Sequence, residues 1–292
     1  MNEQQLESWS QAPSPTEQER SKNAVTEAIA AVVAQFGSRV SSIRQGSYHN
    51  RTNVRLDSDV DVAVIYDDSY FADTTRMSAQ ALAGYDAAWT PSSISFAQFK
   101  QAVEFALRTE FGNRVERRNK CIVVNGTDSR NSCDVVPAFN HRRYNQNGQI
   151  TDYGIEFITD QNQQHVVSFP RQHYNNGVWK HEDTNKGFKR IVRIIKRARN
   201  VLVDRGHLAD GIISSFFIEC LVYNIAKDAF ARPTWKERVN EVLNRVYYDM
   251  GYPSRSNAYI EVSALDPLFR GNRTPQQARA FAELVWDQIQ NG

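Results

Sequence analysis

Asp59 and Asp61, two aspartates separated by one residue, have the spacing with the clearest chemical meaning in this chain. They begin an apolar run that continues to Ile65, which is typical of a buried β-strand. Alternate residues of a strand point to the same side, so both carboxylates would share one face. Two carboxylates on one face can hold two Mg²⁺ ions about 3.5 to 4 Å apart, the arrangement that suits in-line phosphoryl displacement. The spacing therefore predicts a nucleotidyl-transfer site.

The Gly46–Ser47 pair precedes these aspartates by a short gap and follows a strand-like segment, 39–45. Glycine lets the backbone approach an anion closely, and backbone N–H groups and the Ser47 hydroxyl can donate to phosphate. The alternative is an ordinary hairpin turn beside two exposed aspartates on an edge strand. The apolar continuation of the strand disfavours this alternative, because two like charges in a buried strand repel unless cations neutralise them. Together the two motifs predict a triphosphate site.

A third carboxylate, Asp134, stands between Cys133 and Val135 in a second apolar stretch. A lone charge there is costly unless a metal or a donor satisfies it. We therefore predict Asp134 as the third metal ligand and as the general base for the acceptor hydroxyl. The alternative is a salt bridge to one of the arginines in 114–118.

These motifs resemble the cGAS/DncV-like nucleotidyltransferases (CD-NTases) of bacterial antiphage signalling (CBASS), within the polymerase-β-like superfamily. Two further stretches resemble the clade called CdnE, so the resemblance covers nearly the whole chain. The stretches that carry it are Gln45–Tyr48, Asp57–Ala63, Asp134–Val136 and Ile213–Asn224 for the family, and Leu6–Ser10 and Phe169–Gly177 for the clade.

The resemblance implies that the chain joins nucleoside triphosphates into a cyclic oligonucleotide second messenger. Asp59, Asp61 and Asp134 would hold two Mg²⁺ ions, for which Mn²⁺ could substitute. The residues implied in nucleotide binding are Gln45, Gly46, Ser47, Ser168, Lys196 and Ser215. Ser214 is adjacent to Ser215, so the assignment between these two serines stays open.

The residue before the Phe169–Pro170 pair is the one most informative about the nucleotide base. In relatives that use uridine this residue is Asn, and in those that favour purines it is commonly Ser; here it is Ser168. The resemblance therefore implies a purine-leaning 3′,3′ cyclic dinucleotide, made from ATP with GTP or UTP as further substrates. One hydrogen bond to a base edge contributes about 1 to 3 kcal/mol of discrimination.

The implied fold is α+β: a polymerase-β-like palm on a mixed sheet, with a C-terminal helical lobe and a central cleft. Residues 1–177 would form the palm lobe with an N-terminal helix, and residues 178–292 the helical lobe. Local patterns agree. They predict helices at 16–36 and 96–111, strands at 39–45, 120–124, 153–159 and 166–169, an irregular loop at 72–95, and helices after Gly177.

Residues 186–200 have the periodicity of an amphipathic helix with Lys189, Arg193 and Lys196 on one stripe. A basic stripe is usually a solvated face. A triphosphate carries about four negative charges that basic side chains can meet, and the family lysine matches Lys196, so we assign that residue alone to the phosphates.

The chain has 292 residues, a net charge of +2 and three cysteines without CxxC spacing. This charge is too small for a genome-scale nucleic-acid binder, and no apolar run approaches the roughly 20 residues of a membrane span. Zinc-dependent DNA binding is not expected, because no zinc motif is present, and the cysteines should be reduced core residues. We expect a cytoplasmic monomer whose product acts on a cyclic-nucleotide-sensing effector.

Two alternatives remain. The same palm could make a linear oligonucleotide or transfer a nucleotide to tRNA or a small molecule. A catalytically silent nucleotide-binding regulator is the second, and the presence of all three carboxylates disfavours it.

Overall fold

The structure is a computed structural model that describes residues 1–54 and 60–292. The chain forms two compact units, each assembled from separate stretches of sequence. Unit 1 comprises the described parts of Met1–Ser14, Ser47–Asp57 and Arg171–Gly292, and unit 2 those of Pro15–Gly46 and Ser58–Pro170. The N-terminal helix and a short internal segment thus belong with the C-terminal helices.

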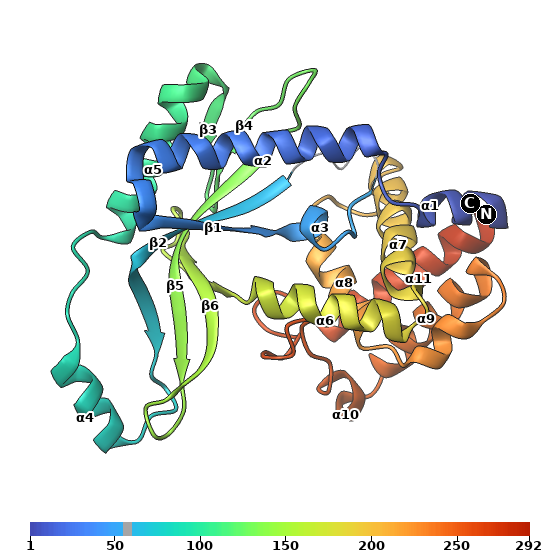
Figure 1. The fold of residues 1–292 in the computed structure, drawn as a ribbon. Helices are drawn as coiled ribbons and strands as arrows, with labels where there is room; N and C mark the ends of the chain where they lie inside the picture. The colour runs from blue at the N-terminus through green and yellow to red at the C-terminus, as the bar shows by residue number, and fades with distance from the viewer. Residues whose placement is uncertain (55–59) are drawn as a thin grey trace. The chain divides into compact units, whose positions relative to one another are not determined.

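Unit 2 is built on a mixed, seven-stranded sheet (Figure 1). The strand order is β1-β2-β5-β4-β3, while β6 pairs with β5 and β7 with β6. The β2–β5 pair is parallel and every other described pair is antiparallel. The strands are β1 (Val40–Gln45), β2 (Val60–Asp73), β3 (Val115–Arg117), β4 (Ile122–Val124), β5 (Cys133–Tyr144), β6 (Ile150–Ile158) and β7 (His165–Ser168).

Helices α2 (Pro15–Phe36) and α5 (Phe96–Phe111) pack on the sheet of unit 2 (Figure 1). Phe99 of α5 lies between Phe36 of α2 and Phe139 of β5, with ring centroids 5.3 and 5.8 Å away. Both helices confirm the sequence prediction, because each has an apolar stripe of period 3.6 that the sheet buries. The predicted strands are also present, within a few residues of the expected ends.

The expectation of an irregular loop at 72–95 is wrong. Strand β2 continues to Asp73, and helix α4 (Ala79–Ala88) follows, capped by the Ser78 hydroxyl. This helix buries none of its residues, so it shows no amphipathic pattern. Its alanines and its N-cap favour a helix without one.

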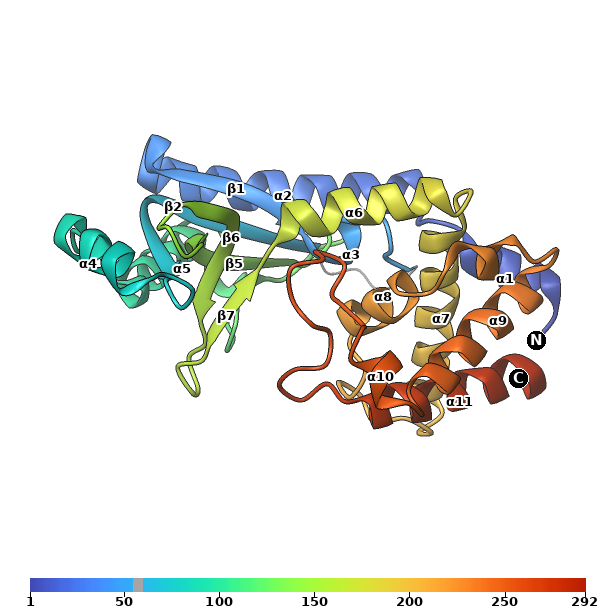
Figure 2. The same ribbon diagram turned by 90° about the horizontal axis from the view of Figure 1, so that it is seen from below.

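Unit 1 is helical, with α1, α7, α9 and α11 packed side by side (Figure 2). Its core is formed by apolar side chains of α7, α8, α9 and α11, as the helical periodicity after Gly177 predicts. The Met1 amino group donates to the Ile289 carbonyl at 2.7 Å, so the two ends of the chain meet within this unit. The α-helices of the described residues not yet given above are α1 (Glu3–Ser10), α3 (Gly46–His49), α6 (Pro170–Asp183), α7 (Gly187–Asp204), α8 (Ser215–Tyr223), α9 (Trp235–Asp249), α10 (Pro253–Ser256) and α11 (Pro275–Asn291).

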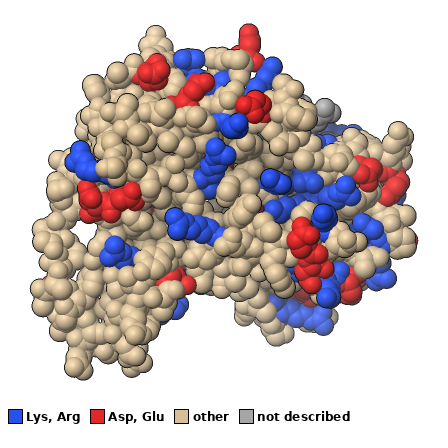
Figure 3. All heavy atoms as spheres, in the orientation of Figure 1, with Lys and Arg blue, Asp and Glu red and all other residues tan. Residues whose placement is uncertain are grey.

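The surface charges, the helices and the cysteines each bear on an expectation from the sequence. Lys and Arg side chains are interspersed with acidic ones on the face shown in Figure 3, with no single basic field. In the described part of the chain, no helix combines the length and apolarity needed to cross a bilayer. All three cysteines are buried thiols, as predicted.

Candidate active site

Strands β1, β2 and β5 place three polar residues in one row across the sheet. Gln45 is the antiparallel partner of Asp61, and Asp61 is the parallel partner of Asp134. Partner residues of neighbouring strands lie about 4.8 Å apart and point to the same face. The structure therefore brings two of the three predicted carboxylates together; the third, Asp59, lies outside the described residues.

The two carboxylates create a negative electrostatic environment. Burial raises the pKa of the Cys121 thiol to about 12, and the charge of Asp134 adds to this shift. Burial likewise raises the pKa of Cys133, with Asp134 and Asp61 as the next causes. Both neighbouring thiols thus stay protonated, and the site favours a cation.

Gly46 is required beside Asp61. A Cβ built on Gly46 would overlap the Asp61 carboxylate, and its φ of +70° lies in the region that favours glycine. Gly46 starts α3, a single helical turn that directly follows β1. The backbone of Gly46 therefore lies directly against the Asp61 carboxylate.

The described residues include two of the three predicted metal ligands, Asp61 and Asp134. Within 1–54 and 60–292, His, Cys, Asp and Glu side chains form no cluster of three that could hold a metal ion. The predicted set includes Asp59, which is not among those residues. The two carboxylates that are described offer the hard oxygen ligands that Mg²⁺ prefers.

Segment 47–54 follows as part of unit 1. The Ser47 carbonyl accepts from the backbone N–H groups of Thr52, at 2.9 Å, and Asn53, at 3.1 Å. Thr52 and Asn53 are buried, whereas Ser47 is half-buried. The backbone next to the predicted phosphate-binding serine is thus closed into a tight loop.

The two adjacent serines at the start of α8 have different roles. Ser214 is the N-cap, and its hydroxyl accepts from the Phe217 N–H at 3.1 Å. Ser215 is the first helical residue, half-buried, with its Oγ 3.5 Å from Arg199 Nη2. The Ser214 hydroxyl is engaged in the helix cap, which favours Ser215 as the serine that contacts a ligand.

The basic stripe of α7 is buried, so the solvated face considered from the sequence is wrong. Arg193 donates to the carbonyls of Ser10 and Arg51, both at 2.6 Å. Burial lowers the pKa of Arg193 to about 10 and that of Lys189 to about 8, with neighbouring arginines as further causes. The stripe holds parts of unit 1 together.

Lys196 is fully buried within unit 1. Its ammonium donates to Glu219 Oε1 at 2.8 Å, to the Thr52 carbonyl at 3.2 Å and to the Thr52 hydroxyl at 3.3 Å. These three acceptors match the three donors of a lysine. Direct contact of Lys196 with phosphates stays a prediction, and the observed contacts are with Glu219 and Thr52.

Glu219 was not assigned from the sequence, although a signal exists. It is the one charged residue of α8, a helix of otherwise apolar and small side chains. A lone charge in an apolar stretch is the signal that identified Asp134. In α8 the same signal points to a buried network with Lys196, Thr52, Asn50 and His173.

Ser168 ends β7 and faces Ile155 of β6 in the register. Its backbone passes so close to β6 that a Cβ on Gly154 would lie 2.6 Å from the Ser168 carbonyl oxygen. Phe169 is buried, and the Arg143 guanidinium lies 4.8 Å from its ring centroid. The predicted base-reading serine is half-buried at the end of a strand that packs closely on β6.

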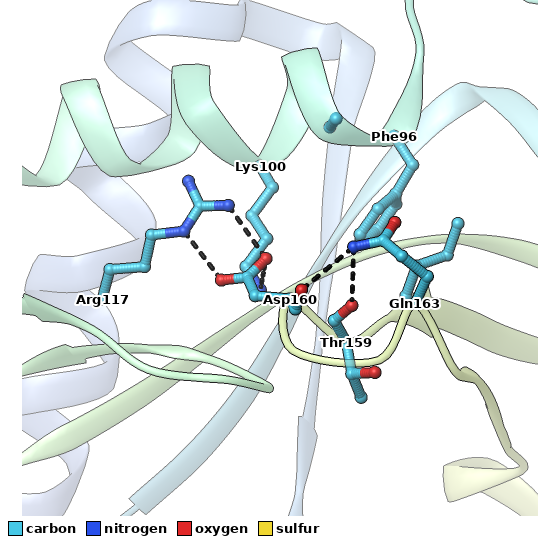
Figure 4. A pocket seen from close by; sticks show the side chains of 8 residues that line it. Phe96, Lys100, Arg117, Thr159, Asp160 and Gln163 are labelled. Carbon is cyan, nitrogen blue, oxygen red and sulfur yellow. Dashed lines mark hydrogen bonds and ion pairs between the residues drawn. The ribbon is translucent and has the colours of Figure 1, made fainter.

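A separate surface pocket of about 350 Å³ lies in unit 2 (Figure 4). Its charged residues neutralise one another: Asp160 pairs with Lys100 at 2.9 Å and with Arg117 at 2.8 Å. The hydrogen bond from Arg117 keeps the pKa of Asp160 below its usual value, with burial acting in the opposite direction. None of the predicted site residues lines this pocket, and we assign it no function.

Known proteins are similar to this chain in sequence. The family described as the cGAS/DncV-like nucleotidyltransferase C-terminal helical domain matches residues 175–290. A cyclic dipurine nucleotide synthase of Elizabethkingia meningoseptica is 42% identical over 291 residues, covering 99% of this chain and 98% of the relative. A cyclic dipyrimidine nucleotide synthase, CdnE, of Cecembia lonarensis is 35% identical, with 99% and 98% covered.

A solved structure shows the same fold over nearly the whole chain. It is the CdnE cyclic dinucleotide synthase of Elizabethkingia meningoseptica with GTP and Apcpp, 39% identical, with a TM-score of 0.84. It covers 98% of this chain and 98% of its own. The predicted mixed sheet with a C-terminal helical part is thus confirmed.

Proposed function

Because this chain belongs to the cGAS/DncV-like nucleotidyltransferases, of the CdnE type, we propose that it joins two nucleoside triphosphates into a cyclic dinucleotide. The product would be a second messenger of antiphage defence, read by a cyclic-nucleotide-sensing effector. The observation that carries the proposal is the pairing of Asp61 with Asp134 across β2 and β5.

We propose Asp61 and Asp134, with Asp59, as the ligands of two Mg²⁺ ions, for which Mn²⁺ would substitute. The row of carboxylates, the negative environment and the glycine beside Asp61 fit such ions. When bound, the ions would lower the effective pKa of the attacking hydroxyl and neutralise departing pyrophosphate.

The chemistry proceeds in two equivalent steps. A ribose hydroxyl of one triphosphate attacks the α-phosphate of the other, an ester forms and pyrophosphate leaves. Asp134 accepts the hydroxyl proton. The remaining hydroxyl of the linear intermediate then attacks the remaining α-phosphate, which closes the ring and releases a second pyrophosphate.

For phosphate binding we propose Gln45, Gly46, Ser47 and Ser215. Two findings support this: both serines are half-buried, and the helix cap engages the hydroxyl of Ser214 and not that of Ser215. We also propose that the chain divides by function between residues 177 and 178. Residues 1–177 would form the catalytic palm, and residues 178–292 the helical lobe. A monomer in the cytoplasm, where nucleoside triphosphates are available, completes the proposal.

We further propose a purine-leaning product, with ATP as a substrate and GTP or UTP as alternatives. Two findings support this: the serine at position 168 and the relative of 42% identity, which is a dipurine synthase. The relative of 35% identity is a dipyrimidine synthase, so the base preference needs its own test.

The test is product identification. The protein is incubated with each α-³²P-labelled triphosphate and with pairs of them, treated with phosphatase, and analysed by mass spectrometry. We expect a phosphatase-resistant product with the mass of a cyclic dinucleotide, rich in adenine or guanine, and none from Asp134→Asn. A product that phosphatase shortens to a linear dinucleoside monophosphate, which loses the label of its terminal α-phosphate and keeps that of its internal phosphodiester, would instead indicate a linear nucleotidyltransferase. No turnover in any mixture, with ATP still bound, would indicate a regulator.

A further inference from the structure

Glu219 is a buried carboxylate that gathers four side chains from three other parts of unit 1. Its side chain is 4% exposed and lies in α8, four residues after Ser215. Oε1 accepts from the Lys196 ammonium of α7 at 2.8 Å and from the Thr52 hydroxyl. Oε2 accepts from His173 of α6 at 3.0 Å and from the Asn50 amide at 3.3 Å.

The charge on Glu219 is fixed by this environment. Burial alone would raise the pKa of its carboxyl, but the Lys196 charge and the His173 hydrogen bond outweigh burial and hold the pKa well below its usual range. Glu219 and Lys196 therefore form a desolvated ion pair. Such a pair adds little net stability, but it strongly favours the one arrangement in which both charges are satisfied.

That arrangement includes the loop after Ser47. Thr52 is held twice, because its hydroxyl donates to Glu219 and its carbonyl accepts from Lys196. The Thr52 N–H in turn donates to the Ser47 carbonyl at 2.9 Å. A continuous chain of hydrogen bonds thus runs from α8 through Thr52 to the backbone of Ser47.

We propose that Glu219, paired with Lys196, is a positioning residue that fixes segment 47–54 relative to the start of α8. One carboxylate would then set the places of both Ser47 and Ser215, the two serines that bind the triphosphate in the proposed function, on which this inference rests. Glu219 itself touches no substrate. Because a reacting group displaced by about 1 Å can cost 10²-fold in rate, a rigid anchor for these serines has a functional value.

The experiment compares wild type with Glu219→Gln, Lys196→Met, the double variant and Thr52→Val. Two readouts are taken on each: amide hydrogen exchange of peptides covering 47–54, and the steady-state kinetics of ATP. Asp228→Asn is the matched control, since it removes a carboxylate of an exposed ion pair, with Arg245, in the same unit. Thermal unfolding reports whether each variant is folded.

In Glu219→Gln we expect exchange in 47–54 to rise about tenfold or more, with α9 and α11 little changed. The KM for ATP should rise about tenfold while kcat falls less, because substrate placement is weakened before chemistry is lost. Thr52→Val should show the same pattern, and it tests the anchor even if Glu219→Gln fails to fold. Asp228→Asn should behave as wild type.

The double variant decides the role of Lys196. If both residues act as one anchor, the double variant should be no worse than the poorer single variant. Additive losses would overturn the proposal, because Lys196 and Glu219 would then act independently and not as one anchor. Unchanged exchange at 47–54 in folded Glu219→Gln and Thr52→Val would also overturn it.

The two proposals can fail separately. Absence of any cyclic product from wild type would remove the proposed function, while hydrogen exchange would still show whether Glu219 anchors the loop. Normal synthesis with unaltered exchange and KM in the variants would remove the anchor and leave the proposed function standing.

Discussion

Unit 2 brings two like charges together, Asp61 and Asp134 on partner positions of adjacent strands, whereas unit 1 brings opposite charges together, Lys196 and Glu219 at 2.8 Å. Neighbouring like charges cost free energy in the protein alone, and a bound cation would offset that cost. An opposite pair satisfies itself and specifies structure. Neutralising a charge should therefore have opposite effects on stability in the two units.

The largest effect is expected from neutralising the carboxylate row. Asp61→Asn and Asp134→Asn should each reduce product formation by about 10³-fold or more, because each removes a proposed metal ligand, and bound metal contributes several kcal/mol to the transition state. The Tm should stay equal or rise, since repulsion is relieved. Glu219→Gln should lower the Tm instead. Product assays with thermal unfolding check both, and a fall in Tm for Asp61→Asn would break the comparison.

Gly46 tests the geometry of that row. Gly46→Ala should reduce activity by about 10²-fold, because the new Cβ displaces the Asp61 carboxylate. Gly37→Ala is the matched control: Gly37 has a similar φ, +61°, but its Cβ would meet nothing within 4 Å. Both variants carry the backbone cost of about 1 kcal/mol. Equal activities in the two variants would contradict the close approach of Gly46 to Asp61.

His181 provides a pH-dependent test of the burial of basic side chains in unit 1. Burial, followed by the charges of Lys189 and Arg193, lowers the pKa of His181 to about 4. In the unfolded state the pKa of His181 is near 6.5, so between about pH 6.5 and pH 4 the unfolded state binds more protons than the folded state. The free energy of unfolding should therefore fall as the pH drops from about 6.5 towards 4. We expect a loss of about 2 kcal/mol after allowance for partial exposure. Denaturant unfolding should show a weaker pH dependence in His181→Gln, and an unaltered one would contradict this account.

The smallest effect concerns base selection. Ser168→Asn should raise the use of UTP relative to ATP by about tenfold, the size of one hydrogen bond to a base edge. Competition between the four triphosphates measures this ratio. An unchanged nucleotide profile would remove Ser168 from the specificity assignment.

The sequence predicts unit 2 well because its signals are local. Alternation along β2 and the lone acidic residue of β5 indicate which residues share a face, and the register places Asp61 beside Asp134. Helix α4 has no such signal, since nothing in it is buried. Its alanines and the Ser78 N-cap favour a helix, but they are weaker signals than a buried apolar stripe.

Unit 1 was harder to predict because its contacts are distant in sequence. The stripe that contains Lys196 has the periodicity of an exposed basic face, and only tertiary packing shows that it is buried. Thr52 and Lys196 are 144 residues apart in the chain, yet they are hydrogen-bonded. The lone charge of Glu219 in α8 was the local clue to this network.

The central claim is that Asp61 and Asp134 hold divalent cations for a bound triphosphate. Isothermal titration calorimetry with Apcpp, in Mg²⁺ and in EDTA, tests it most directly. The account predicts tight uptake by the wild type in Mg²⁺, weak uptake in EDTA, and no difference between the two conditions in Asp61→Asn/Asp134→Asn. Equal binding by the wild type with and without Mg²⁺, or an intact Mg²⁺ effect in the folded double variant, would contradict it.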